Sequence, residues 1–127
     1  MSGDQPTRRE FSRVPVHLKA EIRADGKVYR DGTMENLSLK GGFFRTGASI
    51  QDGVAVDVRL HLDGTGIEVH TRGFVVRGSG EGFAVQFTEI VGLDSLEHLR
   101  NIILFNTHDP HRVEEEFHSH LGLKRPE

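Results

Sequence analysis

The sequence predicts a mainly β protein: a six-stranded antiparallel β-barrel followed by two C-terminal α-helices. Three observations support this prediction. Apolar and polar residues alternate in several short segments, which is the pattern of strands with one buried face. Fifteen glycines among 127 residues favour frequent turns. No long amphipathic helix separates the alternating segments, so parallel strands with helical crossovers are not expected, and closure into a barrel leaves no sheet edge exposed.

The six expected strands are short and mostly joined by hairpin turns. The first is the clearest, because apolar residues from Val14 to Ile22 alternate with polar ones. Asp25-Gly26 follows with the composition of a tight hairpin turn. A short third strand opens at Phe43, and the glycine-rich run 78–82 turns the chain into the last strand. The remaining strands are expected at residues 27–36, 54–62, 67–77 and 83–87.

The first helix is expected soon after the last strand. Leu96, Leu99 and Ile103 recur at helical spacing, which predicts one apolar face. Asp94 precedes them and is predicted to cap the helix, with Glu97 three residues later to complete a capping box.

The second helix is expected to begin after residues 107–108. Asp109 is predicted to cap it, and Pro110 would lie in its first turn, where the missing N–H costs nothing. Val113, Phe117 and Leu121 are spaced four residues apart and form a single apolar stripe. Because an isolated helix of this length is marginal in water, the stripe should be buried against another part of the protein or a partner.

These elements divide the chain into three parts. We assign residues 1–13 to a flexible, arginine-bearing N-terminal segment, residues 14–90 to the barrel, and residues 91–127 to a helical extension. Apolar runs are too short for a signal peptide or a membrane span. We therefore expect a cytoplasmic protein without membrane insertion. We also expect a monomer rather than a dimer.

Composition and missing motifs argue against several function classes. The net charge of −3 disfavours general binding of nucleic-acid polymers. The absence of cysteine excludes disulfides, cysteine-ligated zinc and a thiol nucleophile. The common phosphate-loop, metalloprotease and nucleophile-elbow motifs are also missing. We expect neither an enzyme nor a bound cofactor.

Two other functions are weaker candidates. His111, Glu115 and His118 could approach one another on the second helix as metal ligands, but a solvated polar face explains them equally well, and we expect no metal. A surface for single-stranded nucleic acid needs several exposed aromatic side chains. The chain has one tyrosine, Tyr29, and no tryptophan, and most of its phenylalanines follow the apolar pattern of a core.

Arginines are concentrated just ahead of the first strand. Arg8, Arg9 and Arg13 place three guanidinium groups within six residues. Guanidinium groups bind phosphate and the O6/N7 edge of guanine through paired hydrogen bonds. A solvated basic tail is the alternative explanation.

A second polar group ends the second strand. Asn36 and Ser38 are two residues apart, so their side chains should leave the strand on the same side. Gly41 follows, where the backbone must turn or a ligand come close. An ordinary strand-end turn would use the same residue types.

The two features together resemble the motifs of the PilZ domain family. They read Arg9-Glu10-Phe11-Ser12-Arg13 ahead of the barrel and Asn36-Leu37-Ser38-Leu39-Lys40-Gly41 at the end of the second strand, with Arg8 as the preceding arginine that many members carry. The run 82–87 is similar to the last barrel strand of the family, and the resemblance covers about residues 8–90.

The resemblance implies a receptor for the bacterial second messenger cyclic di-GMP. Arg8, Arg9 and Arg13 would clamp guanine edges and phosphates, and Asn36 and Ser38 would contact a base or phosphate from the barrel surface. The bound ligand would change the surface that a protein partner meets.

Two further residues take implied roles. Gly41 would allow the ligand to approach closely. Arg77 stands near the place where some members offer a tryptophan, and it is a candidate to stack on a purine. The alternative that keeps the fold is a PilZ-like module that binds no nucleotide and works by protein contacts alone.

Overall fold

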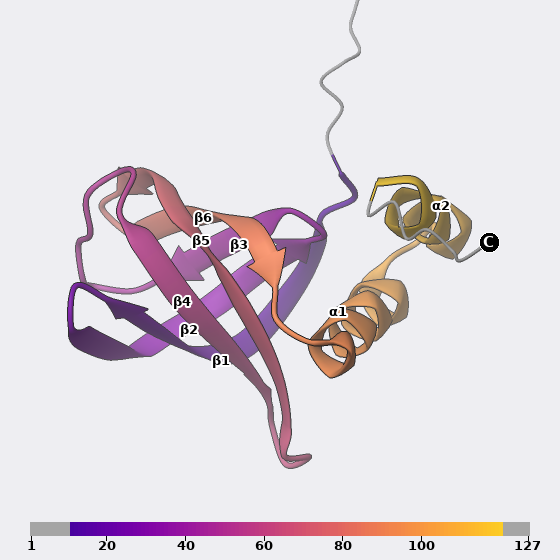
Figure 1. The fold of residues 1–127 in the computed structure, drawn as a ribbon, viewed down its shortest axis with the longest axis horizontal. Helices are drawn as coiled ribbons and strands as arrows, with labels where there is room; N and C mark the ends of the chain where they lie inside the picture. The colour runs from indigo at the N-terminus through magenta and orange to yellow at the C-terminus, as the bar shows by residue number, and fades with distance from the viewer. Residues whose placement is uncertain (1–10, 121–127) are drawn as a thin grey trace, which may run out of the picture.

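The barrel predicted from the sequence is present. The structure is a computed structural model that describes residues 11–120, and it shows a closed six-stranded antiparallel barrel with two helices beside it (Figure 1). The strands are β1 (Val14–Ala24), β2 (Lys27–Ser38), β3 (Gly41–Arg45), β4 (Ala55–Leu62), β5 (Ile67–Ser79) and β6 (Gly82–Ile90). The helices are α1 (Leu93–Asn106) and α2 (Pro110–His120).

The strands follow the order β1-β2-β3-β6-β5-β4 around the barrel, and β4 closes onto β1. Four neighbouring pairs are hairpins, and the chain between β3 and β4 crosses to the other edge before closure. The turn between β1 and β2 is the predicted one, because Asp25 and Gly26 both have positive φ, 53° and 78°, as the tightest hairpin turns require.

The core fills the barrel with the side chains that the alternation predicts. Val14, Leu18, Ala20 and Ile22 of β1 are buried and Val16 is partly buried, whereas Pro15, His17 and Lys19 between them are exposed. Phe44 and Phe83 are fully buried, and their ring centroids lie 5.4 Å apart in a tilted arrangement, a geometry that aromatic pairs favour.

The predicted cap of α1 is wrong. The first helical residue is Leu93, and Gly92 occupies the capping position with φ 91°. The Leu96 N–H donates to the Gly92 carbonyl, and no side chain caps the helix. The glycine turns the chain from β6 straight into the helix, so Asp94 falls in the first turn and the capping box with Glu97 does not form.

The predicted start of α2 is confirmed. The Arg112 N–H donates to the Oδ1 atom of Asp109 at 3.1 Å, and Pro110 is the first residue of the helix. Val113 and Phe117 are buried, and α2 packs against α1 through this stripe. Leu121 lies outside the described residues. Neither described helix is long and apolar enough to cross a membrane.

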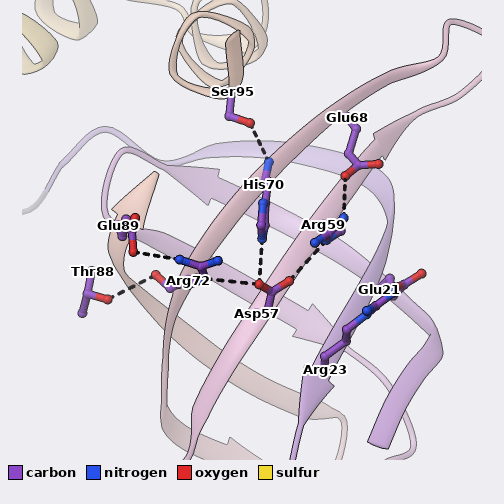
Figure 2. A network of polar contacts seen from close by, with 10 residues as sticks. All are labelled: Glu21, Arg23, Asp57, Arg59, Glu68, His70, Arg72, Thr88, Glu89 and Ser95. Carbon is purple, nitrogen blue, oxygen red and sulfur yellow. Dashed lines mark hydrogen bonds and ion pairs between the residues drawn. The ribbon is translucent and has the colours of Figure 1, made fainter. Parts of the chain in front are cut away.

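A polar network on the outer side of β4 and β5 connects the barrel to α1 (Figure 2). Asp57 lies at its centre, with its Oδ2 atom 2.7 Å from His70 Nε2 and 3.3 Å from Arg72 Nε. The Oδ1 atom accepts a hydrogen bond from Arg59 Nε at 3.3 Å. The backbone N–H of His70 donates to the Ser95 hydroxyl of α1 at 2.9 Å, which fastens the helix to β5.

The network makes a prediction about pH. Burial works to raise the pKa of Asp57, but the hydrogen bonds with His70 and Arg59 outweigh it and hold the pKa below its ordinary value. The ionised carboxylate therefore stabilises the fold above the unfolded pKa of about 3.9, and this contribution is lost as the pH falls through the folded pKa. We expect Asp57→Asn to unfold at lower urea than the wild type at pH 7, with the difference shrinking towards pH 3. A difference that stays constant across this range would contradict the assignment.

Candidate ligand-binding site

A cavity of about 330 Å³ opens on the barrel surface where the N-terminal segment meets the turn between β2 and β3 and the strands β5 and β6. Four of the predicted site residues line it: Arg13, Ser38, Gly41 and Arg77. The fold thus brings together side chains from both motifs and from β5.

The remaining predicted residues are Asn36, Arg8 and Arg9. Asn36 is not among the residues that line the cavity, but its Oδ1 atom accepts a hydrogen bond from Arg13 Nη1 at 3.1 Å. This bond joins the arginine motif to the strand motif. Arg8 and Arg9 lie outside the described residues, so the flexibility expected for residues 1–13 stays a prediction for residues 1–10. In the described part of this segment, Ser12 is hydrogen-bonded to Glu116 of α2.

The two arginines of this cavity differ from the other described arginines in their ion pairs. Among the described residues, Arg13 and Arg77 form no ion pair with a carboxylate. Every other described arginine has a carboxylate oxygen within 3.6 Å: Arg23, Arg30, Arg45, Arg59, Arg72, Arg100 and Arg112. Lys40 adds a third cationic side chain to the lining. The cavity therefore concentrates positive charge that the described carboxylates do not neutralise, which suits an anionic ligand.

Ser38 serves the turn as well as the cavity. Its side chain is buried, and its hydroxyl accepts a hydrogen bond from the Lys40 N–H at 3.1 Å and donates to the Gly41 carbonyl at 3.3 Å. These two bonds form the ordinary strand-end turn that was the alternative explanation of this motif in the sequence. One acceptor position of the hydroxyl is left for a further partner.

Gly41 has a reason within the barrel itself. A Cβ atom at this position would lie 2.1 Å from the Val85 carbonyl oxygen of β6, so no side chain fits there. The sequence suggested that this glycine admits a ligand. The structure explains it by the close approach of β3 to β6, although the residue also lines the cavity.

Sequence reasoning missed seven residues that line the cavity, and the aromatic, charged and amide side chains among them are Phe11, Lys40 and Gln86. Phe11 and Lys40 lie inside the two motifs, at positions where the motif specifies no residue type. Gln86 is exposed on β6 and stands in register with Gly41. Its place depends on the pairing of β3 with β6, which no local pattern indicates.

The possible metal site on α2 is not assembled in the part of the chain that the structure describes. Within residues 11–120, no group of three or more histidine, aspartate or glutamate side chains could hold a metal ion. His111 instead lies 3.3 Å from Glu115, one helical turn away, and both side chains are exposed.

Comparison with known proteins agrees with the fold. Residues 7–105 match the PilZ domain family. The PilZ domain of CeSA from a cellulose-synthesising bacterium is 19% identical, with a TM-score of 0.58, covering 74% of this chain and 96% of that one. The Bacillus subtilis inhibitor of motility (MotI/DgrA) is 18% identical, with a TM-score of 0.61, covering 94% of this chain and 55% of that one. At these identities the two similarities concern the fold alone. No curated protein matches the sequence.

Proposed function

The chain belongs to the PilZ domain family, and on that basis we propose that it is a receptor for cyclic di-GMP that signals to a protein partner. The family is known for receptors and adaptors of this nucleotide rather than for enzymes. The ligand would bind at the cavity between the N-terminal segment and the strands β5 and β6. Arg8 and Arg9 would add to the site from the segment that precedes Phe11.

The observation that carries this proposal is the pair of cavity arginines that have no carboxylate partner within residues 11–120. Arg13 directly precedes β1 and Arg77 lies on β5, yet both line one cavity. A ligand with two phosphates supplies the negative charge that these groups lack. Each of its two guanines offers the acceptors O6 and N7, and one guanidinium group can donate a hydrogen bond to both. The face of a guanine can also stack on the plane of a guanidinium group.

A second candidate is a PilZ module that works by protein contacts without nucleotide. Two observations favour it: the similarity in fold to a protein named as an inhibitor of motility, and the exposed apolar side chains of Leu93 and Phe105 on α1. The two cavity arginines argue against it, because a module that binds no anion gains nothing from keeping Arg13 and Arg77 without a carboxylate partner among the described residues.

Calorimetric titration separates the two candidates. We expect heat of binding for cyclic di-GMP and much weaker binding of GMP and cyclic AMP, which lack either the second guanine or guanine altogether. Absence of binding to all three nucleotides would favour the protein-contact module. Equal binding to all three would indicate a general anion site.

The polar residues of the second strand make a smaller prediction. We expect Asn36→Ala and Ser38→Ala each to weaken cyclic di-GMP binding less than the loss of Arg13, because hydrogen bonds between neutral groups contribute only about 0.5–1.5 kcal/mol. Titration of variants with unchanged melting temperature measures this order. If Ser38→Ala weakened binding more than Arg13→Ala at equal stability, the division of roles would be wrong.

A further inference from the structure

A carboxylate of α2 holds the chain at the edge of the cavity. The Glu116 side chain accepts hydrogen bonds from the Ser12 backbone N–H at 3.0 Å and 3.1 Å, one to each oxygen. The Ser12 hydroxyl donates a third bond, to Oε2, at 2.9 Å. Both residues are partly buried, and Glu116 retains 15% of its side-chain exposure. Figure 1 shows α2 beside the start of the described chain, as these bonds require.

The position of Ser12 gives these bonds their importance. Ser12 lies between Phe11 and Arg13, and both of these neighbours line the cavity. The carboxylate that fixes Ser12 therefore also fixes the backbone from which Arg13 reaches the cavity. Arg13 in turn points towards Asn36, to which it donates a hydrogen bond at 3.1 Å.

The bonds leave the charge of Arg13 available. Glu116 contacts neutral groups of Ser12, and its own charge is balanced by Arg112, whose Nε atom lies 3.3 Å away. An anionic ligand at Arg13 thus meets no carboxylate of residues 11–120 that it would have to displace. The helix that carries Glu116 is itself held in place, because Asp109 caps α2 and the buried Phe117 packs it against the core.

We propose that Glu116 is a positioning residue of the cyclic di-GMP site, an inference that rests on the function proposed above. By holding Ser12, it orders Phe11 and Arg13 before the ligand arrives, so that less conformational entropy is lost on binding. The coupling is reciprocal: a ligand that binds the ordered segment also stabilises the docking of α2. The surface of α2 would then depend on whether the nucleotide is bound.

The test compares two glutamates of the same helix. Glu116→Ala removes the bonds to Ser12, whereas Glu115→Ala removes an exposed carboxylate that pairs only with His111 among its described neighbours. We expect Glu116→Ala to bind cyclic di-GMP roughly tenfold more weakly than the wild type in calorimetry, and Glu115→Ala to bind like the wild type. If Glu116→Ala is poorly folded, Glu116→Gln, which keeps an acceptor oxygen but loses the charge, should show a smaller loss in the same direction.

A double-mutant cycle distinguishes positioning from a general loss of stability. If Glu116 acts through Arg13, the affinity lost on Arg13→Ala should be smaller in the Glu116→Ala background than in the wild type. Additive losses would overturn the positioning role. In the absence of ligand, the Ser12 amide should exchange with solvent faster in Glu116→Ala, and unchanged exchange would also overturn it.

The outcomes separate this inference from the proposed function. A wild-type protein that binds no cyclic di-GMP overturns the receptor function, and the positioning role with it. A wild type that binds, with a well-folded Glu116→Ala variant of equal affinity, overturns the positioning role alone.

Discussion

Replacing Arg13 with alanine is expected to weaken the binding of cyclic di-GMP by roughly 10- to 150-fold, the equivalent of one lost charge-assisted hydrogen bond of about 1.5–3 kcal/mol. Arg13 lines the cavity and has no carboxylate partner among the described residues, so its charge is available to a phosphate or a guanine edge. The side chain is exposed and lies outside the core. The melting temperature should therefore stay close to that of the wild type.

Arg23→Ala provides a matched control for this variant. Arg23 is also an exposed arginine, but it lies on β1 and already pairs with Glu21, 2.9 Å away. It should affect binding little, because its charge is already engaged away from the cavity. Equal affinity in Arg13→Ala and the wild type would contradict the assignment of the site. Equal losses in Arg13→Ala and Arg23→Ala would show that only net charge matters.

The strands could be predicted from the sequence because their signal is local. Alternation from Val14 to Ile22 and the Asp25-Gly26 turn depend on side-chain direction and backbone freedom over a few residues, and both are confirmed. The pairing of β3 with β6 and the closure of β4 onto β1 join distant segments. Closure itself could be expected, because open edges are costly, but the register that puts Gln86 opposite Gly41 could not.

The helix starts show how a local signal can fail. Asp94 and Asp109 are equally good capping residues in the sequence, yet only Asp109 caps. The difference lies in the residue before the helix. Gly92 adopts a positive φ between β6 and α1, and the helix begins directly after it at Leu93. Asp94 is therefore already inside the helix and cannot cap it.

The candidate site was predictable as far as its motifs extend. Arg13, Ser38 and Gly41 belong to the two motifs, and the fold brings them into one cavity. Glu116 had no comparable signal. A glutamate on the polar face of an amphipathic helix is ordinarily solvated, and its contact with Ser12 spans 104 residues of sequence. Such a contact depends on where the chain places α2 after α1, and the spacing of apolar residues along the sequence does not specify that position.

Phe117→Ala is expected to destabilise the protein by about 3–5 kcal/mol, the usual cost of removing a buried phenylalanine ring. Only 4% of Phe117 is exposed, and it belongs to the same core cluster as Leu99 and Ile103 of α1. Phe105→Ala is the matched control, because Phe105 is 89% exposed and should cost less than about 0.5 kcal/mol. Urea unfolding of both variants and the wild type measures the difference. Similar losses in the two variants would mean that α2 does not depend on its apolar stripe. A large loss in Phe117→Ala alone would establish α2 as part of the folded core, the condition under which its Glu116 can hold Ser12 at the cavity.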